Sequence, residues 1–215
     1  ANWYEVDLAT NSYGQGIAVT PLQMLTAINT IANQGRLMRP YVVSKIVTAN
    51  SSRNFGPVEV RQVIAPQTAA TVLKLMNDVV DGVEQHGAKT PGYHVAGKTG
   101  TTLVSIPTGY DLDSTIASFA GFIPYEDPQI SVLVKIDQPG GGLNLGGQVA
   151  APVFESIASQ IMDYLRETVA EHGGGGDVGE GAVAVAPEVR ALGEVHAENL
   201  VLEVPAVDAT ICHGH

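Results

Sequence analysis

Three consecutive strand-like segments in the middle of the chain constrain its fold more than any other feature. They cover residues 93–104, 115–123 and 129–137, and the short connection IPYEDPQ joins the last two. Parallel neighbours would need a crossover of about a dozen residues or more, so this spacing favours antiparallel pairing. An amphipathic segment follows at 150–168. We therefore expect an antiparallel meander covered by a helix.

Helix start and stop signals predict a helix over about 20–34, in TPLQMLTAINTIANQG. Thr20 and Gln23 form a capping box, Pro21 suits the first helical position, and Gly35 ends the pattern. A second helix is predicted over 65–83. One side of it is apolar: Val72, Leu73, Met76, Val79, Val80 and Val83.

The remaining segments of the body are shorter. YVVSKIVTA (41–49) alternates like a strand, and NSSRNFGP (50–57) is typical of a turn. Residues 84–92 and 138–148 are predicted loops, the latter rich in glycine. The order is therefore α–β–α–β–β–β–α, which indicates an α+β fold.

The charge is distributed unevenly. Residues 1–170 carry 14 acidic and 10 basic side chains, whereas residues 171–215 carry 8 acidic side chains and one basic one. The second segment begins with a run of glycines and predicts a linker and mostly disordered tail, with one further strand pattern in ENLVLEVPAV. The net charge of −11 argues against nucleic acid or an anionic membrane surface as the main partner.

Other patterns predict no cofactor, metal site or catalytic carboxylate pair. The histidines, including the CHGH terminus with Cys212, lack a supporting carboxylate at ligand spacing. Asp111 and Asp113 are expected in a polar loop, as solvated acids. No apolar run reaches the roughly 18 residues of a membrane-spanning helix, and the single cysteine excludes an intrachain disulfide.

The stretch YHVAGKTGTT places a lysine, glycines and threonines in a predicted strand. Alternation puts Thr99 and Thr101 on one face, about 7 Å apart, and Lys98 on the other. Gly97 and Gly100 weaken a strand unless another backbone comes close. The pattern predicts an edge strand where an extended peptide pairs, two hydroxyls bind a carboxylate and the ammonium sets the local potential. The alternative is a solvent-facing lysine on an ordinary strand with a glycine bulge.

Three blocks together resemble a known family. VAGKTGTT, with SYGQGIAVTPLQMLTAINTIANQG about 80 residues upstream and ASFAGFIPYEDPQISVLVKID downstream, is similar in order and spacing to the transpeptidase domain of class B penicillin-binding proteins. The division-type enzymes, which cross-link septal peptidoglycan, match best over about residues 10–168. The resemblance implies the penicillin-recognising serine transpeptidase and β-lactamase-like fold, with only its C-terminal part present in residues 1–170.

The resemblance also implies roles for the lysine strand. Lys98 would be the lysine of the family's third motif and assist proton transfer. Thr99 and Thr101, separated by Gly100, would bind the carboxylate of a terminal D-alanine or of a β-lactam. The backbone N–H of Thr101 would donate to the oxyanion.

In SYGQG, Tyr13 and Gln15 fall where family members line the wall of the substrate pocket. Gly14 and Gly16 would let this loop pass close to the substrate.

The family's nucleophile does not occur in this chain. In the family, the serine of an S-x-x-K motif is the nucleophile that forms the acyl-enzyme, and a second motif, S-x-N, completes the site. No serine here has Lys three residues on or Asn two residues on; the nearest imitation, Thr71 to Lys74, lies in a regular helix. Both motifs precede SYGQG in the family, so we expect them before Ala1 and expect the chain alone to be inactive.

A smaller departure follows the lysine motif. Thr102 and Leu103 stand where relatives usually carry a small residue and then Gln or Glu. This difference leaves open whether position 103 makes a polar contact.

The first hypothesis is a serine D,D-transpeptidase at the outer face of the cytoplasmic membrane, anchored by a preceding segment. Its expected partners are stem peptides ending in D-Ala-D-Ala, β-lactams and membrane proteins of the division complex. The alternative is a non-catalytic penicillin sensor or division scaffold. A hydrolytic β-lactamase fits less well, because GQG-x-x-VTPLQM matches transpeptidases better.

Overall fold

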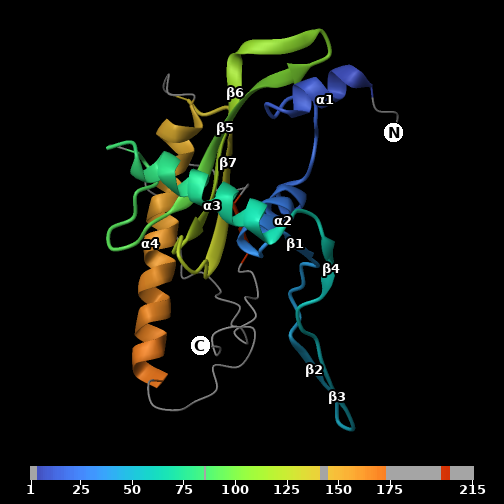
Figure 1. Cartoon of the computed structure of the whole chain (residues 1–215), viewed down its shortest axis with the longest axis vertical. Coiled ribbons are helices and arrows are strands. Elements are labelled where there is room, and N and C mark those ends of the chain that lie inside the picture. Colours follow the sequence, from blue (N-terminus) through green and yellow to red (C-terminus); the bar gives the residue numbers. More distant parts are fainter. Residues whose placement is uncertain (1–3, 85, 141–144, 173–199, 204–215) are drawn as a thin grey trace.

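The computed structural model describes residues 4–84, 86–140, 145–172 and 200–203 (Figure 1). Its helices are α1 (Glu5–Asn11), α2 (Pro21–Ala32), α3 (Pro66–Asp81) and α4 (Gly146–His172). Its strands are β1 (Arg36–Met38), β2 (Lys45–Val47), β3 (Ser52–Asn54), β4 (Glu59–Gln62), β5 (Ala96–Ile106), β6 (Gly109–Ile123), β7 (Ile130–Asp137) and β8 (Leu200–Glu203). The α+β class is confirmed.

The main sheet has the order β5-β6-β7-β8, and each described pair is antiparallel. This arrangement confirms the predicted meander. Thr99 pairs with Phe119, and Ala120 pairs with Leu133. β5 forms one edge of the sheet, so its outer backbone groups pair with no other described strand.

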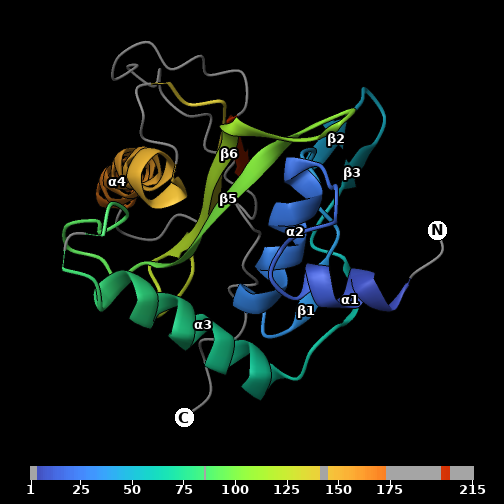
Figure 2. The ribbon, with the colours of Figure 1, turned by 90° about the horizontal axis from the view of Figure 1, so that it is seen from above.

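Helices cover both faces of this sheet, as Figure 2 shows with α4 on one side and α2 on the other. On the α4 side, Phe119 and Phe154 are buried, with their ring centroids 4.8 Å apart in an edge-to-face arrangement. On the α2 side, Leu25 packs with Ala120 and Leu133. Each buried Phe or Leu side chain contributes about 1.5–3 kcal/mol to folding, so these two clusters hold the sheet in place.

The prediction for α2 is confirmed in detail. The Gln23 N–H donates to Thr20 Oγ1 (3.2 Å), and the Thr20 N–H donates to Gln23 Oε1 (2.9 Å). Pro21 occupies the first helical position. This start was predictable because the capping partners lie three residues apart in sequence.

The position of α3 agrees with the prediction, but not all of the residues predicted for its apolar side are buried. Val80 is buried, but Val79 and Val83 are exposed. Asn77 is buried instead, and its Nδ2 donates to the Val95 carbonyl at 3.0 Å. Apolar periodicity cannot find this contact, because the acceptor lies on a different segment of the chain.

α4 is longer than predicted at both ends. It begins at Gly146, inside the predicted loop at 138–148, and it ends at His172 rather than at 168. The early start has a tertiary cause: the Gly146 N–H donates to Thr101 Oγ1 on β5 at 3.1 Å. The orphan amide of the first turn is therefore satisfied by a residue that sequence proximity does not reveal.

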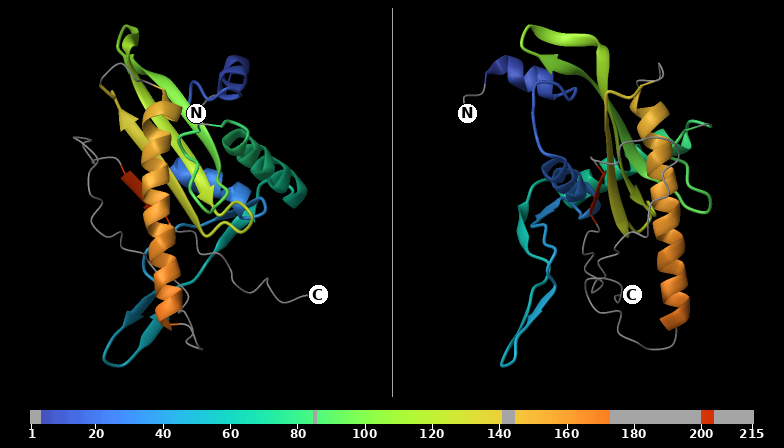
Figure 3. Two further views of the ribbon diagram at one scale, coloured as in Figure 1. Left: turned by 90° about the vertical axis from the view of Figure 1, so that its left-hand side faces the viewer. Right: turned by 180° about the vertical axis from the view of Figure 1, so that it is seen from behind.

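The segment between α2 and α3 forms two small two-stranded sheets, β1 with β4 and β2 with β3. The predicted strand over 41–49 shrinks to β2, and the predicted turn over 50–57 contains β3. The β2–β3 hairpin projects from the body (Figure 3), and Val42 beside it is 80% exposed. These strands are short and lack a buried face. The alternation of apolar residues over 41–49 therefore predicted a longer strand than the one that forms.

The segment between the first two strands of the meander was also mispredicted. β5 starts at Ala96 rather than at residue 93, and β5 and β6 continue to a tight turn at 107–108. Asp111, which is half-buried, and Asp113, which is exposed, therefore lie on β6 and not in a loop. The pKa of Asp111 lies below its usual value, because Ser114 hydrogen-bonds to its carboxylate and the Asp113 N–H donates to it.

Three further points concern the ends of the chain. α1 was not predicted, although Glu5 and Asp7 favour a helix start and the Tyr4 N–H donates to Asp7 Oδ2 at 2.8 Å. β8 lies within ENLVLEVPAV and pairs with β7, which confirms the strand pattern there. The rest of the predicted tail, with Cys212, His213 and His215, lies outside the described residues. No helix in the described part of the chain is long and apolar enough to cross a membrane.

Gly97 offers a test of the packing between β5 and the core. A Cβ added there would lie 2.8 Å from Phe119 Cε1, and that ring is fully buried. Gly97→Ala should therefore destabilise the folded domain by about 1–3 kcal/mol. Gly56→Ala is the control, because an added Cβ there meets nothing. Equal denaturation midpoints for the two variants, in urea unfolding of the domain that contains this chain, would refute the prediction.

His86 predicts a pH dependence. Burial, and then the charge of Lys89, hold its pKa below the ordinary 6.5, and its Nδ1 accepts the Ala88 N–H at 3.2 Å. Its folded pKa is below its unfolded pKa, so its contribution to stability is present above the unfolded value and lost as pH falls through the folded one. His86→Leu should weaken the loss of stability between about pH 7.5 and about pH 5 in urea unfolding. An unchanged pH profile would contradict this role.

Candidate active site

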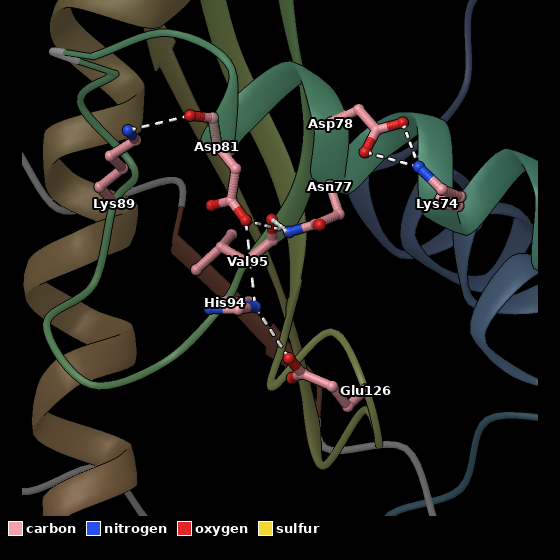
Figure 4. A network of polar contacts seen from close by, with 8 residues as sticks. All are labelled: Lys74, Asn77, Asp78, Asp81, Lys89, His94, Val95 and Glu126. Atoms are coloured by element: carbon pink, nitrogen blue, oxygen red, sulfur yellow. Dashed lines mark hydrogen bonds and ion pairs between the residues drawn. The ribbon is translucent and has the colours of Figure 1, made fainter.

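The start of β5 is fixed to α3 by a polar network (Figure 4). Asn77 Nδ2 donates to the Val95 carbonyl at 3.0 Å and to Asp81 Oδ2 at 3.1 Å. His94 Nδ1 lies 2.8 Å from Glu126 Oε1 and 4.0 Å from Asp81 Oδ2. α3 therefore positions the residues that lead into the lysine strand.

On the same helix, Thr71 and Lys74 each have their own local partner. Thr71 Oγ1 donates to the Gln67 carbonyl at 2.9 Å. Lys74 Nζ donates to both carboxylate oxygens of Asp78, at 2.9 and 2.7 Å, and this contact raises the pKa of the lysine. The two side chains thus have separate local partners, as expected for an ordinary exposed helix.

The glycines near Lys98 allow close approach between elements. A Cβ on Gly146 would collide with the carbonyls of Gly100 and Ser118, so the first turn of α4 lies directly against β5 and β6. At Gly100 an added Cβ would meet the side chain of Ser118, while the Gly100 carbonyl lies against Gly146. At Gly97 the neighbour is instead the ring of Phe119.

Thr99 and Thr101 lie beside the first turn of α4. Thr101 Oγ1 accepts the Gly146 N–H, and a Cβ on Gly147 would lie 3.5 Å from the Thr99 methyl. A helix N-terminus carries partial positive charge, and α4 is a long helix. Because Thr101 Oγ1 already accepts this hydrogen bond, its own proton is free to be donated to an anion.

Lys98 lies on the exposed side of the edge strand. Its Nζ donates to the Thr99 carbonyl at 2.8 Å and to Thr99 Oγ1 at 3.3 Å. Cross-strand pairing sets Lys98 opposite Ala120, on the α2 side, while Thr101 stands opposite Ala117. A cation and two hydroxyls therefore lie on one edge strand within a few residues.

The loop after α1 lies close to the same strand. Thr102 Oγ1 donates to Gln15 Oε1 at 3.3 Å, across 87 residues of sequence. Tyr13, in contrast, is 68% exposed. The structure therefore brings Gln15 to β5, next to the threonines, and leaves the Tyr13 ring largely in solvent.

Two residues of this region were not among the predicted site residues. The sequence predicts Gly146 in a flexible loop, and it shows Thr102 only as a departure from the family pattern. Each gains its contact through tertiary folding, and nothing in the neighbouring sequence announces it. Among the described residues, no group of three His, Cys, Asp or Glu side chains could hold a metal ion.

Known proteins match the chain over most of this body. The family model described as "Penicillin binding protein transpeptidase domain" matches residues 1–162. The chain belongs to this family, as part of a class B transpeptidase domain. It is 36% identical over 163 residues to stage V sporulation protein D of Bacillus subtilis and 33% identical over 161 residues to the peptidoglycan D,D-transpeptidase FtsI of Escherichia coli K12.

Solved structures of the family agree with the fold. The apo transpeptidase domain of penicillin-binding protein 3 from Burkholderia pseudomallei is 36% identical with a TM-score of 0.61, over 78% of this chain and 48% of that one. Apo penicillin-binding protein 3 of Mycobacterium tuberculosis is 31% identical with a TM-score of 0.67, over 78% and 40%. Each of the two curated relatives matches over 74% of this chain, which spans about a quarter of their length.

The capping contact between Thr101 and Gly146 can be tested through stability. Thr101→Val removes the acceptor and leaves the Gly146 N–H without its partner, which should cost about 1–3 kcal/mol. Thr101→Ser keeps the hydroxyl and serves as the control. Urea unfolding should separate the two variants, and faster hydrogen exchange at the Gly146 amide should accompany the loss. Valine and serine variants of equal stability would rule the contact out.

Proposed function

We propose that this chain forms the lysine-strand side of the active site of a peptidoglycan D,D-transpeptidase. The observation that carries the proposal is the grouping of Lys98, Thr99 and Thr101 on an edge strand beside the N-terminus of α4. A peptide carboxylate would find two hydroxyl donors, an ammonium group and a helix dipole within one small region. Each of these features favours an anion.

The bound peptide would lie along β5. An edge strand offers backbone N–H and C=O groups to an extended ligand, which then adds as a further strand. With the carboxylate held by Thr99 and Thr101, the N–H of Thr101 would donate to the oxygen of the scissile carbonyl. Charge develops on that oxygen during acyl transfer, so a fixed donor there lowers the barrier. Gly100 keeps this length of strand free of a side chain.

Lys98 would act on the nucleophile from this strand. Its ammonium would stabilise negative charge near the attacking serine and assist proton transfer. The serine itself would come from the part of the domain that this chain lacks, where the S-x-x-K and S-x-N motifs are expected. We further propose that the complete protein is held at the outer face of the cytoplasmic membrane by a segment outside this chain and works with division-complex membrane proteins.

The substrate class follows from the family and from the chemistry of the strand. Stem peptides ending in D-Ala-D-Ala present a free carboxylate next to the scissile bond, and β-lactams present the same pair of groups. Structures of Mycobacterium tuberculosis penicillin-binding protein 3 have been solved with aztreonam and with ampicillin. This supports β-lactams as ligands of the present site.

A non-catalytic penicillin sensor or division scaffold is the second candidate. The lack of any S-x-x-K or S-x-N sequence in the chain favours the scaffold form of this candidate. Two measurements distinguish this candidate from the enzyme: acylation of the protein by a penicillin, and turnover of a peptide donor with an acceptor amine. A sensor acylates without turnover, a scaffold does neither, and a transpeptidase does both.

The experiment is labelling with a fluorescent penicillin. We expect the full-length protein to form a covalent adduct and the isolated 215-residue chain to form none. Thr99→Val combined with Thr101→Val should reduce the second-order acylation rate about 100- to 10,000-fold, because it removes two hydrogen bonds to a charged group, which contribute about 1.5–3 kcal/mol each. The matched double serine variant should retain most of the rate. A full-length protein that takes up no penicillin would refute the catalytic proposal.

A further inference from the structure

α1 and the loop that follows it stand apart from the rest of the described fold. α1 packs against none of the other described helices and strands, and Figure 1 shows it beside the far end of the β5–β6 hairpin rather than on the sheet. Leu8 and Val6 on this helix are exposed. Helix packing therefore does not determine where the loop lies.

The loop itself has a defined shape built on α1. The Gln15 N–H donates to the Thr10 carbonyl at 3.0 Å, and the Gly14 N–H donates to the Asn11 carbonyl at 3.0 Å. Gly14 and Gly16 have φ of +84° and +79°, which only glycine adopts without strain. A Cβ on Gly16 would also lie 2.9 Å from Thr10 Oγ1. These contacts join the loop and α1 into one structural unit.

One side-chain contact joins this unit to the lysine strand: Thr102 Oγ1 donates to Gln15 Oε1 at 3.3 Å. Both side chains are half-buried. Thr102 follows Thr101 directly, so the contact is made one residue away from the proposed carboxylate site. Alternation along β5 turns Thr102 to the face opposite Thr101, and the two neighbours therefore hold different structures: α4 on one face and the α1 loop on the other.

We propose that Thr102 is a positioning residue that holds Gln15, and through it the whole loop over residues 12–16, against the substrate strand. This inference rests on the proposed transpeptidase site. With the contact in place, the loop forms one wall beside the acyl side of the substrate and keeps Tyr13 within reach of it. Without the contact, the α1 unit has no described packing to hold it there.

The expected effect is on ligand binding rather than on bond formation. Thr102 has no hydrogen bond to the carboxylate donors or to Lys98, so the limiting acylation rate of Thr102→Val should stay unchanged. Losing the wall should raise the penicillin concentration needed for half-maximal acylation rate by about 3- to 10-fold, the range given by one net hydrogen bond. A change in the core of the sheet would instead alter both parameters and the stability.

The test is a double-mutant cycle in the full-length protein with a fluorescent penicillin as the probe. The variants are Thr102→Val, Gln15→Leu and the two combined, with Thr102→Ser as the conservative control. Acylation is followed over a range of penicillin concentrations. We expect each single variant to raise the half-saturating concentration, the double variant to be no worse than either, and the serine variant to behave as the wild type. Such non-additivity identifies two residues that act through one contact.

Hydrogen exchange of the segment 10–20 supplies a readout that does not depend on activity. Thr102→Val should speed exchange in this segment, and Thr102→Ser should not. Unchanged exchange would overturn the inference. So would additive effects in the cycle, or an equal rise of the half-saturating concentration in the valine and serine variants. If the wild type takes up no penicillin, the proposed function fails, and the exchange experiment still decides whether Thr102 holds the loop.

Discussion

The contact between the first turn of α4 and strands β5 and β6 is the constraint on which the rest of the site depends. Gly146 lies against the carbonyls of Gly100 and Ser118 and donates its N–H to Thr101. A side chain at position 146 would push the helix away from the sheet. The contact starts α4 where its later residues can bury Phe154 against Phe119, and it places the positive end of the helix beside two threonines.

The edge position of β5 leaves one side of this strand available for the proposed peptide. β6 pairs with one side of β5, α4 and α2 cover the sheet, and no other described strand pairs with the second side. An exposed edge normally invites aggregation, and proteins keep one where a ligand is to be bound. Lys98 on this edge supplies charge, and Gly97 and Gly100 allow the strand to lie close to its neighbours. Packing requirements and the proposed recognition of a peptide would therefore favour the same small residues.

The described fold also has apolar surface that it does not bury. Three apolar side chains are largely exposed: Val42 beside the projecting hairpin, Val47 on it, and Leu8 on α1. The chain covers less than half of each matching solved structure from Burkholderia pseudomallei and Mycobacterium tuberculosis.

The sequence by itself determined the elements whose signals are local. The capping box of Thr20 and Gln23, the meander of three close strands and the lysine motif each depend on residues a few positions apart, so α2, the antiparallel sheet and the candidate strand were predictable. Only the tertiary structure decided what lies against that strand. The cap on α4 from Thr101, the burial of Asn77 against Val95 and the contact of Gln15 with Thr102 join residues 18 to 87 positions apart. Such contacts form because the folded chain satisfies buried polar groups wherever a partner is brought near, and no local pattern records which partner that is.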